Sequence, residues 1–186
     1  MQSGPSFLTS GRGAFRFVLP LLFVSMWQAA WGDISAFVGD YTGSAEVSSA
    51  TGEEQMRDMS VSISKTKGGF SVSWSSTTLR TGGDSKTKAY TIDFVPSQRD
   101  GVFAAAMQTN MFGHSVPLDP MKGEPYVWAR LIGDTLSVYS LFVTDVGEYE
   151  LQQYDRMLAE GGLNLDFQIL QGGKVQRRVS TFLQKR

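Results

Sequence analysis

The chain has 186 residues, of which 41% are hydrophobic and 19% are charged, with one histidine and no cysteine. This hydrophobic content excludes a chain that is disordered throughout, and the length suits a single domain. The 17 basic and 18 acidic residues give no broad basic surface for nucleic acid. Without cysteine the chain forms no disulfide, thiolate zinc site or iron–sulfur cluster, so we predict neither a metal site nor a cofactor.

The first 32 residues, 1–32, have the order of a secretory signal peptide. Arg12 and Arg16 precede an apolar run over 17–26, which is shorter than the roughly 20 residues of a spanning helix. Small residues then predict cleavage after Gly32, with Ala30 as the alternative, and an uncleaved anchor is the other interpretation of the segment. Removal of this leader leaves 154 residues with a formal charge of −3. We expect this mature chain to be exported to the periplasm or the extracellular space.

Alternation of apolar and polar residues dominates 33–186, which we predict to be a single domain. Met59–Ile63 and Phe70–Ser75 alternate with serine on either side of Gly68 and Gly69, which predicts a β-hairpin whose glycines supply positive φ. A strand is favoured over a helix at 148–160, because tight turns flank that segment. The remaining expected strands, bounded by turn residues, are 36–47, 90–95, 102–108, 126–132, 135–143, 163–170 and 175–183.

About eight or nine strands, with no room for crossover helices, predict an all-β antiparallel fold. Closure into an up-and-down barrel removes exposed edges, and a β-sandwich is the alternative. An outer-membrane barrel is disfavoured, since the alternating runs of about five residues fall short of the roughly 9–11 in a spanning strand. Strands such as 136–143 are apolar on both faces, which predicts cover by a neighbouring element, a homodimer partner or an envelope protein.

A short motif, Gly39-Asp40-Tyr41, lies in the first expected strand, and Arg177 and Arg178 lie in the last. In these features, and in strand number and length, the chain resembles the lipocalin and calycin superfamily. That superfamily has Gly-x-Trp in its first strand and an arginine near the last strand that packs across the aromatic ring; here Tyr41 replaces the tryptophan. The resemblance implies a cup-shaped barrel with an apolar interior that binds a small lipophilic molecule. A bend glycine beside a core tyrosine is the alternative interpretation.

The other candidate ligand-binding residues come from strands and from one long irregular segment, 110–125. This segment holds three of the six prolines and the only histidine, and it predicts either a lid over the barrel mouth or a packed stopper. Arg130 shares a strand face with Trp128, where it either binds a ligand carboxylate or points outward to water, the favoured orientation for a long cation. The full candidate set is Tyr41, Trp74, Met111, Phe112, His114, Trp128 and Arg130.

These patterns together predict an exported, water-soluble barrel that binds a small apolar or amphipathic molecule and catalyses no reaction. The alternative is a structural or protein-interaction component of a bacterial-type cell envelope, with a filled core. An enzyme is disfavoured, because one histidine, no cysteine and no catalytic motif leave little chemistry to use.

Overall fold

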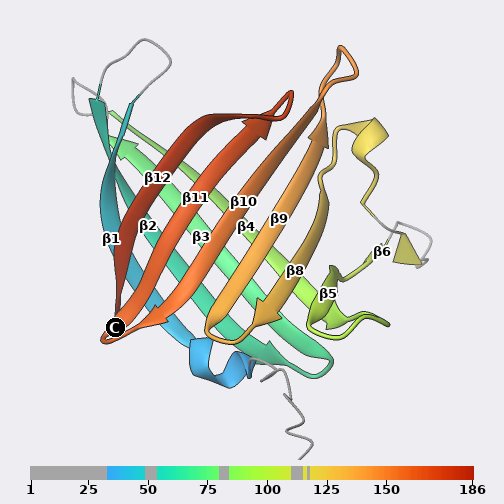
Figure 1. Ribbon diagram of the computed structural model, residues 1–186, viewed down its shortest axis with the longest axis horizontal. Helices are drawn as coiled ribbons and strands as arrows, with labels where there is room; N and C mark the ends of the chain where they lie inside the picture. The colour runs from blue at the N-terminus through green and yellow to red at the C-terminus, as the bar shows by residue number, and fades with distance from the viewer. Residues whose placement is uncertain (1–32, 49–53, 80–83, 110–114, 117) are drawn as a thin grey trace, which may run out of the picture.

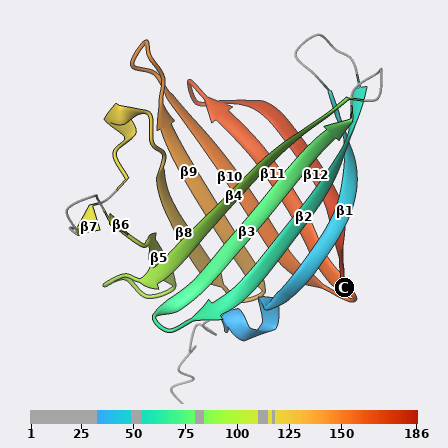
Figure 2. The same ribbon diagram turned by 180° about the vertical axis from the view of Figure 1, so that it is seen from behind.

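The computed structural model describes residues 33–48, 54–79, 84–109, 115–116 and 118–186 (Figure 1). The predicted signal peptide, 1–32, lies outside the described residues. Ten antiparallel strands close into a barrel in the order β1-β12-β11-β10-β9-β8-β5-β4-β3-β2 (Figures 1 and 2). Their bounds are β1 (Gly39–Ser48), β2 (Glu54–Thr66), β3 (Gly69–Leu79), β4 (Ser85–Pro96), β5 (Val102–Ala105), β8 (Tyr126–Ile132), β9 (Thr135–Val143), β10 (Tyr149–Ala159), β11 (Gly162–Gln171) and β12 (Lys174–Lys185).

The closed barrel confirms the predicted all-β antiparallel class and rules out the β-sandwich alternative. The predicted strand number, eight or nine, is wrong, because ten strands close the barrel. The shortest of the ten, β5, spans only four residues of the expected strand 102–108, yet it pairs with both β4 and β8. The strands are also longer than the apolar runs that predicted them. In the 13-residue β2, polar Gln55 and basic Arg57 continue the inward face of Met59 and Val61.

The first predicted hairpin is present as β2 and β3, which pair from Arg57↔Thr78 to Thr66↔Gly69. The expected turn chemistry is wrong, however, because neither Gly68 nor Gly69 has a positive φ. Gly69 is already the first residue of β3, where a Cβ atom would collide with the carbonyl oxygen of Phe94 on β4. This glycine therefore permits the close approach of β3 and β4.

The predicted strand at 148–160 is confirmed as β10, which pairs with β9 on one side and β11 on the other. Serine, threonine and charged residues occupy the outer positions of β1 to β4, for example Ser62, Ser73 and Thr91. Apolar residues occupy the inner positions in one half of the barrel. This core consists of Phe37, Tyr41, Val61, Ile63, Phe70, Val72, Phe94, Val127, Ala129, Leu131, Leu136, Val138, Leu163, Leu165 and Leu183.

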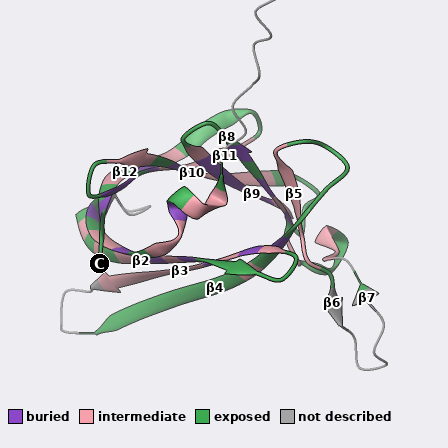
Figure 3. Cartoon of the chain, turned by 90° about the horizontal axis from the view of Figure 1, so that it is seen from below, coloured by how far each residue is buried: buried purple, intermediate pink, exposed green. Residues whose placement is uncertain are grey.

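A 3-10 helix, η1 (Ile34–Phe37), closes the core half of the barrel (Figure 3). Asp33 caps this helix by accepting a hydrogen bond from the backbone N–H of Ser35 at 2.9 Å. Phe37 is completely buried, and its carbonyl oxygen accepts a hydrogen bond of 2.7 Å from the Tyr41 hydroxyl. The helix is thus fixed to the first strand by both packing and a buried hydrogen bond.

The irregular segment between β5 and β8 lies beside the barrel wall (Figures 1 and 2). It contains a two-stranded sheet, β6 (Gln108–Thr109) with β7 (Ser115–Val116), and a 3-10 helix, η2 (Pro120–Lys122). Leu118 packs against the core, whereas Met121 is exposed. Within the described ranges, no helix has the length and apolar character needed to cross a membrane.

Candidate ligand-binding site

The half of the barrel away from η1 contains an open cavity of about 430 Å³. Its walls are formed by β2, β3 and β4 on one side and by β10, β11 and β12 on the other. The inward positions along these strands alternate with outward ones, so every second side chain reaches the cavity. The cavity has the size of a small-molecule site, for which volumes of about 300–1,000 Å³ are common.

An aromatic layer crosses the middle of the barrel and contributes to the cavity wall. It consists of Trp74 from β3, Tyr90 from β4, Tyr154 from β10 and Phe167 from β11. The ring centroids of Trp74 and Tyr154 are 5.6 Å apart, and those of Tyr154 and Phe167 are 4.6 Å apart. The layer therefore links opposite walls of the barrel through aromatic contacts.

Tyr154 is the most deeply buried hydroxyl of this layer. Burial raises the pKa of Tyr154 to about 12, and the neighbouring charge of Arg156 opposes this rise. The hydroxyl donates a hydrogen bond of 3.0 Å to Oε1 of Gln152. Gln152 lies two residues nearer the open end, on the same face of β10. Tyr154 is consequently neutral at physiological pH and oriented by a side chain that also lines the cavity.

Arg156 lies beneath the aromatic layer, on the side of the closed end, and its side chain lines the cavity floor. It is only 1% exposed. Its guanidinium carbon is 5.9 Å from the ring centroid of Trp74 and 5.5 Å from that of Tyr154, which provides cation–π stabilisation. Burial lowers the pKa of Arg156 to about 10, so the group keeps its proton at neutral pH.

Four further basic side chains line the cavity nearer its mouth: Arg57, Lys86, Lys88 and Arg177. Burial, followed by the charge of Arg177, lowers the pKa of Arg57. The two arginines are therefore close enough to repel each other. Among the described residues that line the cavity, none is acidic. The described lining of the cavity accordingly combines an apolar, aromatic wall with an excess of positive charge.

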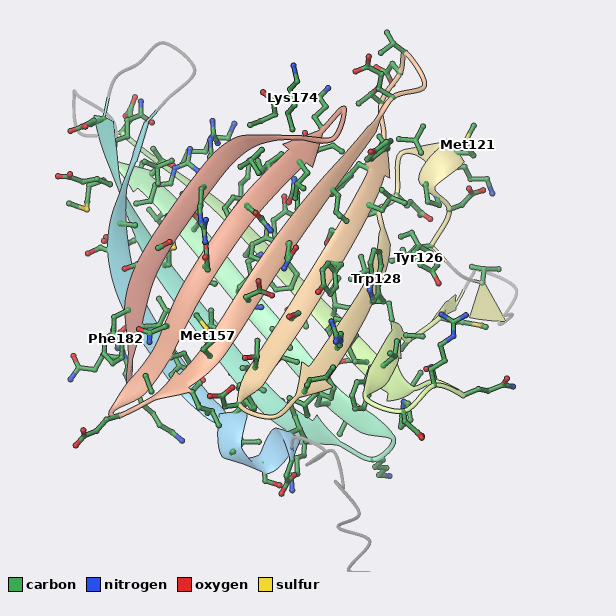
Figure 4. The ribbon with its side chains drawn as sticks, in the orientation of Figure 1. Met121, Tyr126, Trp128, Met157, Lys174 and Phe182 are labelled. Atoms are coloured by element: carbon green, nitrogen blue, oxygen red, sulfur yellow. The ribbon has the colours of Figure 1, made fainter. Side chains whose placement is uncertain are left out.

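The structure places the candidate residues in three different regions. Trp74 lines the cavity, whereas Tyr41 is buried in the closed end and does not line it. Trp128 and Arg130 lie on the outer face of β8, since the alternate residues Val127, Ala129 and Leu131 are the buried ones. Figure 4 shows Trp128 together with Tyr126 on this wall. Met111, Phe112 and His114 lie outside the described residues.

The outward position of Arg130 agrees with the orientation that the sequence favoured, and removes it from the cavity. The cation that lies over the Tyr41 ring is Lys185, at 5.7 Å, and not Arg177 or Arg178. Arg177 lines the cavity, and Arg178 forms a salt bridge with Asp166 on the outside. The arginine-over-ring arrangement implied by the resemblance is therefore absent among the described residues.

The expected lid is not formed by the described part of the 110–125 segment. None of its described residues lines the cavity, and η2 lies against β9 beside the barrel. In the described ranges, no cluster of three or more histidine, aspartate or glutamate side chains is placed to hold a metal ion.

Sequence reasoning missed most of the residues that line the cavity. Arg57 could have been found, because it continues the period-two face of Met59, Val61 and Ile63. Arg156 carries the same signal, two residues after Tyr154. Its burial could not be predicted, since the facing aromatic Trp74 is distant in sequence.

No protein-family model matches the chain, and no curated protein or solved structure matches it either. The similarity to lipocalins and calycins therefore remains a resemblance, carried by the residues already named.

Proposed function

We propose that this protein binds a small amphipathic molecule inside its barrel and catalyses no reaction on it. The observation that carries the proposal is the open cavity of about 430 Å³, bounded by the aromatic layer of Trp74, Tyr90, Tyr154 and Phe167. Aromatic and aliphatic walls with a few convergent polar groups are typical of small-molecule sites.

The division of the barrel into two halves supports this function. Stability is supplied by the packed closed end, where Phe37, Phe70 and Phe94 are completely buried. The open half then need not be filled by its own side chains, and its apolar surface is available to a ligand. The polar outer face of β1 to β4 and the basic-then-apolar leader favour an exported barrel surrounded by water.

A second candidate function is recognition of a protein partner, and it rests on the outer wall at β8 and β9. Trp128 stacks on Tyr139 with ring centroids 4.9 Å apart, and Tyr126 lies 5.8 Å from Trp128. Such an exposed aromatic strip is enriched at protein interfaces. Light scattering gives the molar mass in solution of the parent chain and of Trp128→Ser. This function requires that the parent forms an assembly and that the substitution disrupts it.

Ligand binding is tested with two matched probes, bromoundecanol and bromoundecanoate, whose bromine quenches tryptophan on contact. We expect at least one of them to quench Trp74 saturably. Quenching should persist in Trp128→Phe, which removes the tryptophan of the outer wall. It should disappear in Trp74→Phe, which removes the tryptophan of the cavity. A signal that never saturates, or that follows Trp128, contradicts the proposal.

A cavity-filling pair of variants provides an independent check. Ser76 lines the cavity, so Ser76→Phe should occupy ligand space and weaken binding of the probes. Ser71 lies on the outward face of the same strand, so Ser71→Phe adds the same side chain outside the cavity. Equal binding by the two variants would argue against an internal site.

A further inference from the structure

The arginine beneath the aromatic layer forms no salt bridge with any of the residues that the structure describes. Nε and Nη1 of Arg156 are buried and have no hydrogen-bond partner among the described residues. A buried guanidinium ordinarily binds a carboxylate or several carbonyl oxygens, because loss of hydration without such a partner is costly. The two aromatic rings above it offset only part of this cost.

The neighbouring acids are all directed elsewhere. Asp155 precedes Arg156 on β10 and therefore points to the opposite face, where its carboxylate accepts hydrogen bonds from Ser137 at 2.5 Å and Gln153 at 2.7 Å. Glu150 shares the inward face but lies six positions from Arg156, about 20 Å along a strand at about 3.3 Å per residue. Its carboxylate accepts a hydrogen bond from Gln152.

The other charged residues that line the cavity, nearer its mouth, are also basic. Arg57, Lys86, Lys88 and Arg177 all precede the aromatic layer on the path from solvent to Arg156, because β2, β4 and β12 enter the barrel from its open end (Figure 1). Nε of Arg57 is also buried, and none of the residues that the structure describes forms a hydrogen bond with it. A mouth lined by one sign of charge concentrates ligands of the opposite sign and accelerates their entry.

From these observations we infer that the ligand is an organic anion, with an apolar body and one acidic group, and that the acidic group pairs with the guanidinium of Arg156. This inference rests on the proposed function and specifies its ligand class. The apolar body would lie along Trp74, Tyr154 and Phe167, and the mouth cations would act on the rate of entry. A planar guanidinium provides two parallel donors for a carboxylate, which a neutral head group cannot match.

The test is titration calorimetry of the full chain with bromoundecanoate and bromoundecanol, which differ in the acidic group. We expect the acid to bind at least about tenfold more tightly than the alcohol. Arg156→Met should remove this preference, with the alcohol bound as well as before. Arg130→Met makes the same chemical change on the outer wall and should leave both affinities unchanged.

Two further variants locate the anion and guard against misfolding. Arg156→Lys keeps the charge but loses the two parallel donors, so it should retain part of the preference for the acid. Lys86→Gln with Lys88→Gln should slow binding of the acid and reduce its dependence on salt, with little change in its dissociation rate. Cooperative thermal unfolding verifies that each variant is folded.

The outcomes separate this inference from the function on which it rests. If neither probe binds saturably, the proposed function fails and the inference fails with it. If both probes bind equally and Arg156→Met changes nothing, only the inference is overturned. A preference for the acid that survives Arg156→Met but is lost in Arg57→Met overturns the assignment of the anion to Arg156.

Discussion

The closed and open halves of the barrel use the same strands for different purposes. On β3, the inward residues near η1 are Phe70 and Val72, which are completely buried, whereas Ser76 and Thr78 occupy the equivalent inward positions near the mouth. The change from apolar to polar takes place at Trp74, in the aromatic layer. One alternating strand therefore supplies packing at one end and a binding surface at the other.

Stability and binding are supplied by different side chains, since the packed core around η1 does most of the stabilising and the cavity lining, from Arg156 to the mouth, contacts the ligand. Substitutions in the closed half should change the free energy of unfolding and leave ligand affinity intact. Substitutions in the open half should do the reverse. Each prediction below tests this separation by pairing a change in one region with a control in another.

The largest effect is expected for Phe70→Ala in the closed half. The ring of Phe70 lies between Phe94 and Phe103, with centroid distances of 5.1 and 4.9 Å. Its removal should lower the free energy of unfolding by about 3–5 kcal/mol, because the loss of buried area is accompanied by a cavity. Tyr90→Ala in the aromatic layer, where the residue is 51% exposed, should cost about 1 kcal/mol or less. Urea denaturation measures both, and equal losses would refute the division.

The same division decides how much of the molecule its sequence could predict. The two strands expected on either side of the Gly133-Asp134 turn, 126–132 and 135–143, are present as β8 and β9 with the same bounds. The closed barrel also follows from the alternation, since antiparallel hairpins need no crossover. The two-residue turn at Gly172 and Gly173 has positive φ values of 58° and 74°, unlike the turn at Gly68 and Gly69.

The open half was predicted poorly, because its chemistry depends on contacts across the barrel. The tilted ring contact between Trp74 and Tyr154 joins β3 to β10, and no local sequence pattern reveals that these two residues are neighbours. Arg57 and Arg156 look like ordinary polar positions in the sequence. Their place in the cavity depends on how β2 pairs with β3 and β10 with β11, which puts both side chains on the inward face.

An effect of the opposite sign is expected for Arg156→Met, which removes a buried charge that forms no salt bridge with any described residue. In the absence of ligand this variant should be more stable than the parent by about 1–4 kcal/mol, because a methionine of similar length needs no hydrogen-bond partner. For a domain of this size the melting temperature should rise by several degrees. Arg130→Met on the outer wall should change stability by less than about 0.5 kcal/mol. A loss of stability in Arg156→Met would assign this arginine to packing instead of ligand recognition.

A smaller loss is expected for Tyr41→Phe, which removes the hydrogen bond between the first strand and η1. The hydroxyl donates to the Phe37 carbonyl at 2.7 Å in a buried setting, so its deletion should cost about 1–2 kcal/mol. Affinity for bromoundecanoate should be unchanged, because Tyr41 does not line the cavity. Tyr149→Phe, at a half-exposed tyrosine, is the matched control in thermal unfolding. Loss of probe binding in Tyr41→Phe would show that the two halves are coupled.

The smallest effect is a dependence of stability on alkaline pH that originates in Tyr154. Burial raises the pKa of this hydroxyl from 10 to about 12, so the folded chain keeps a proton that the unfolded chain has released between these values. Stability from this group is complete below pH 10 and falls as the pH rises toward 12. Between pH 9 and 10.5 the decrease should be less than about 1 kcal/mol.

Tyr154→Phe isolates this contribution, because Arg156 and the mouth cations are common to both proteins. The stability of the parent relative to Tyr154→Phe should fall as the pH rises from 9 to 10.5 in urea denaturation. Tyr126→Phe makes the same chemical change at an exposed tyrosine of the outer wall and is the matched control. A constant difference for Tyr154→Phe would mean that water reaches this hydroxyl, and that the aromatic layer does not separate the two halves of the barrel.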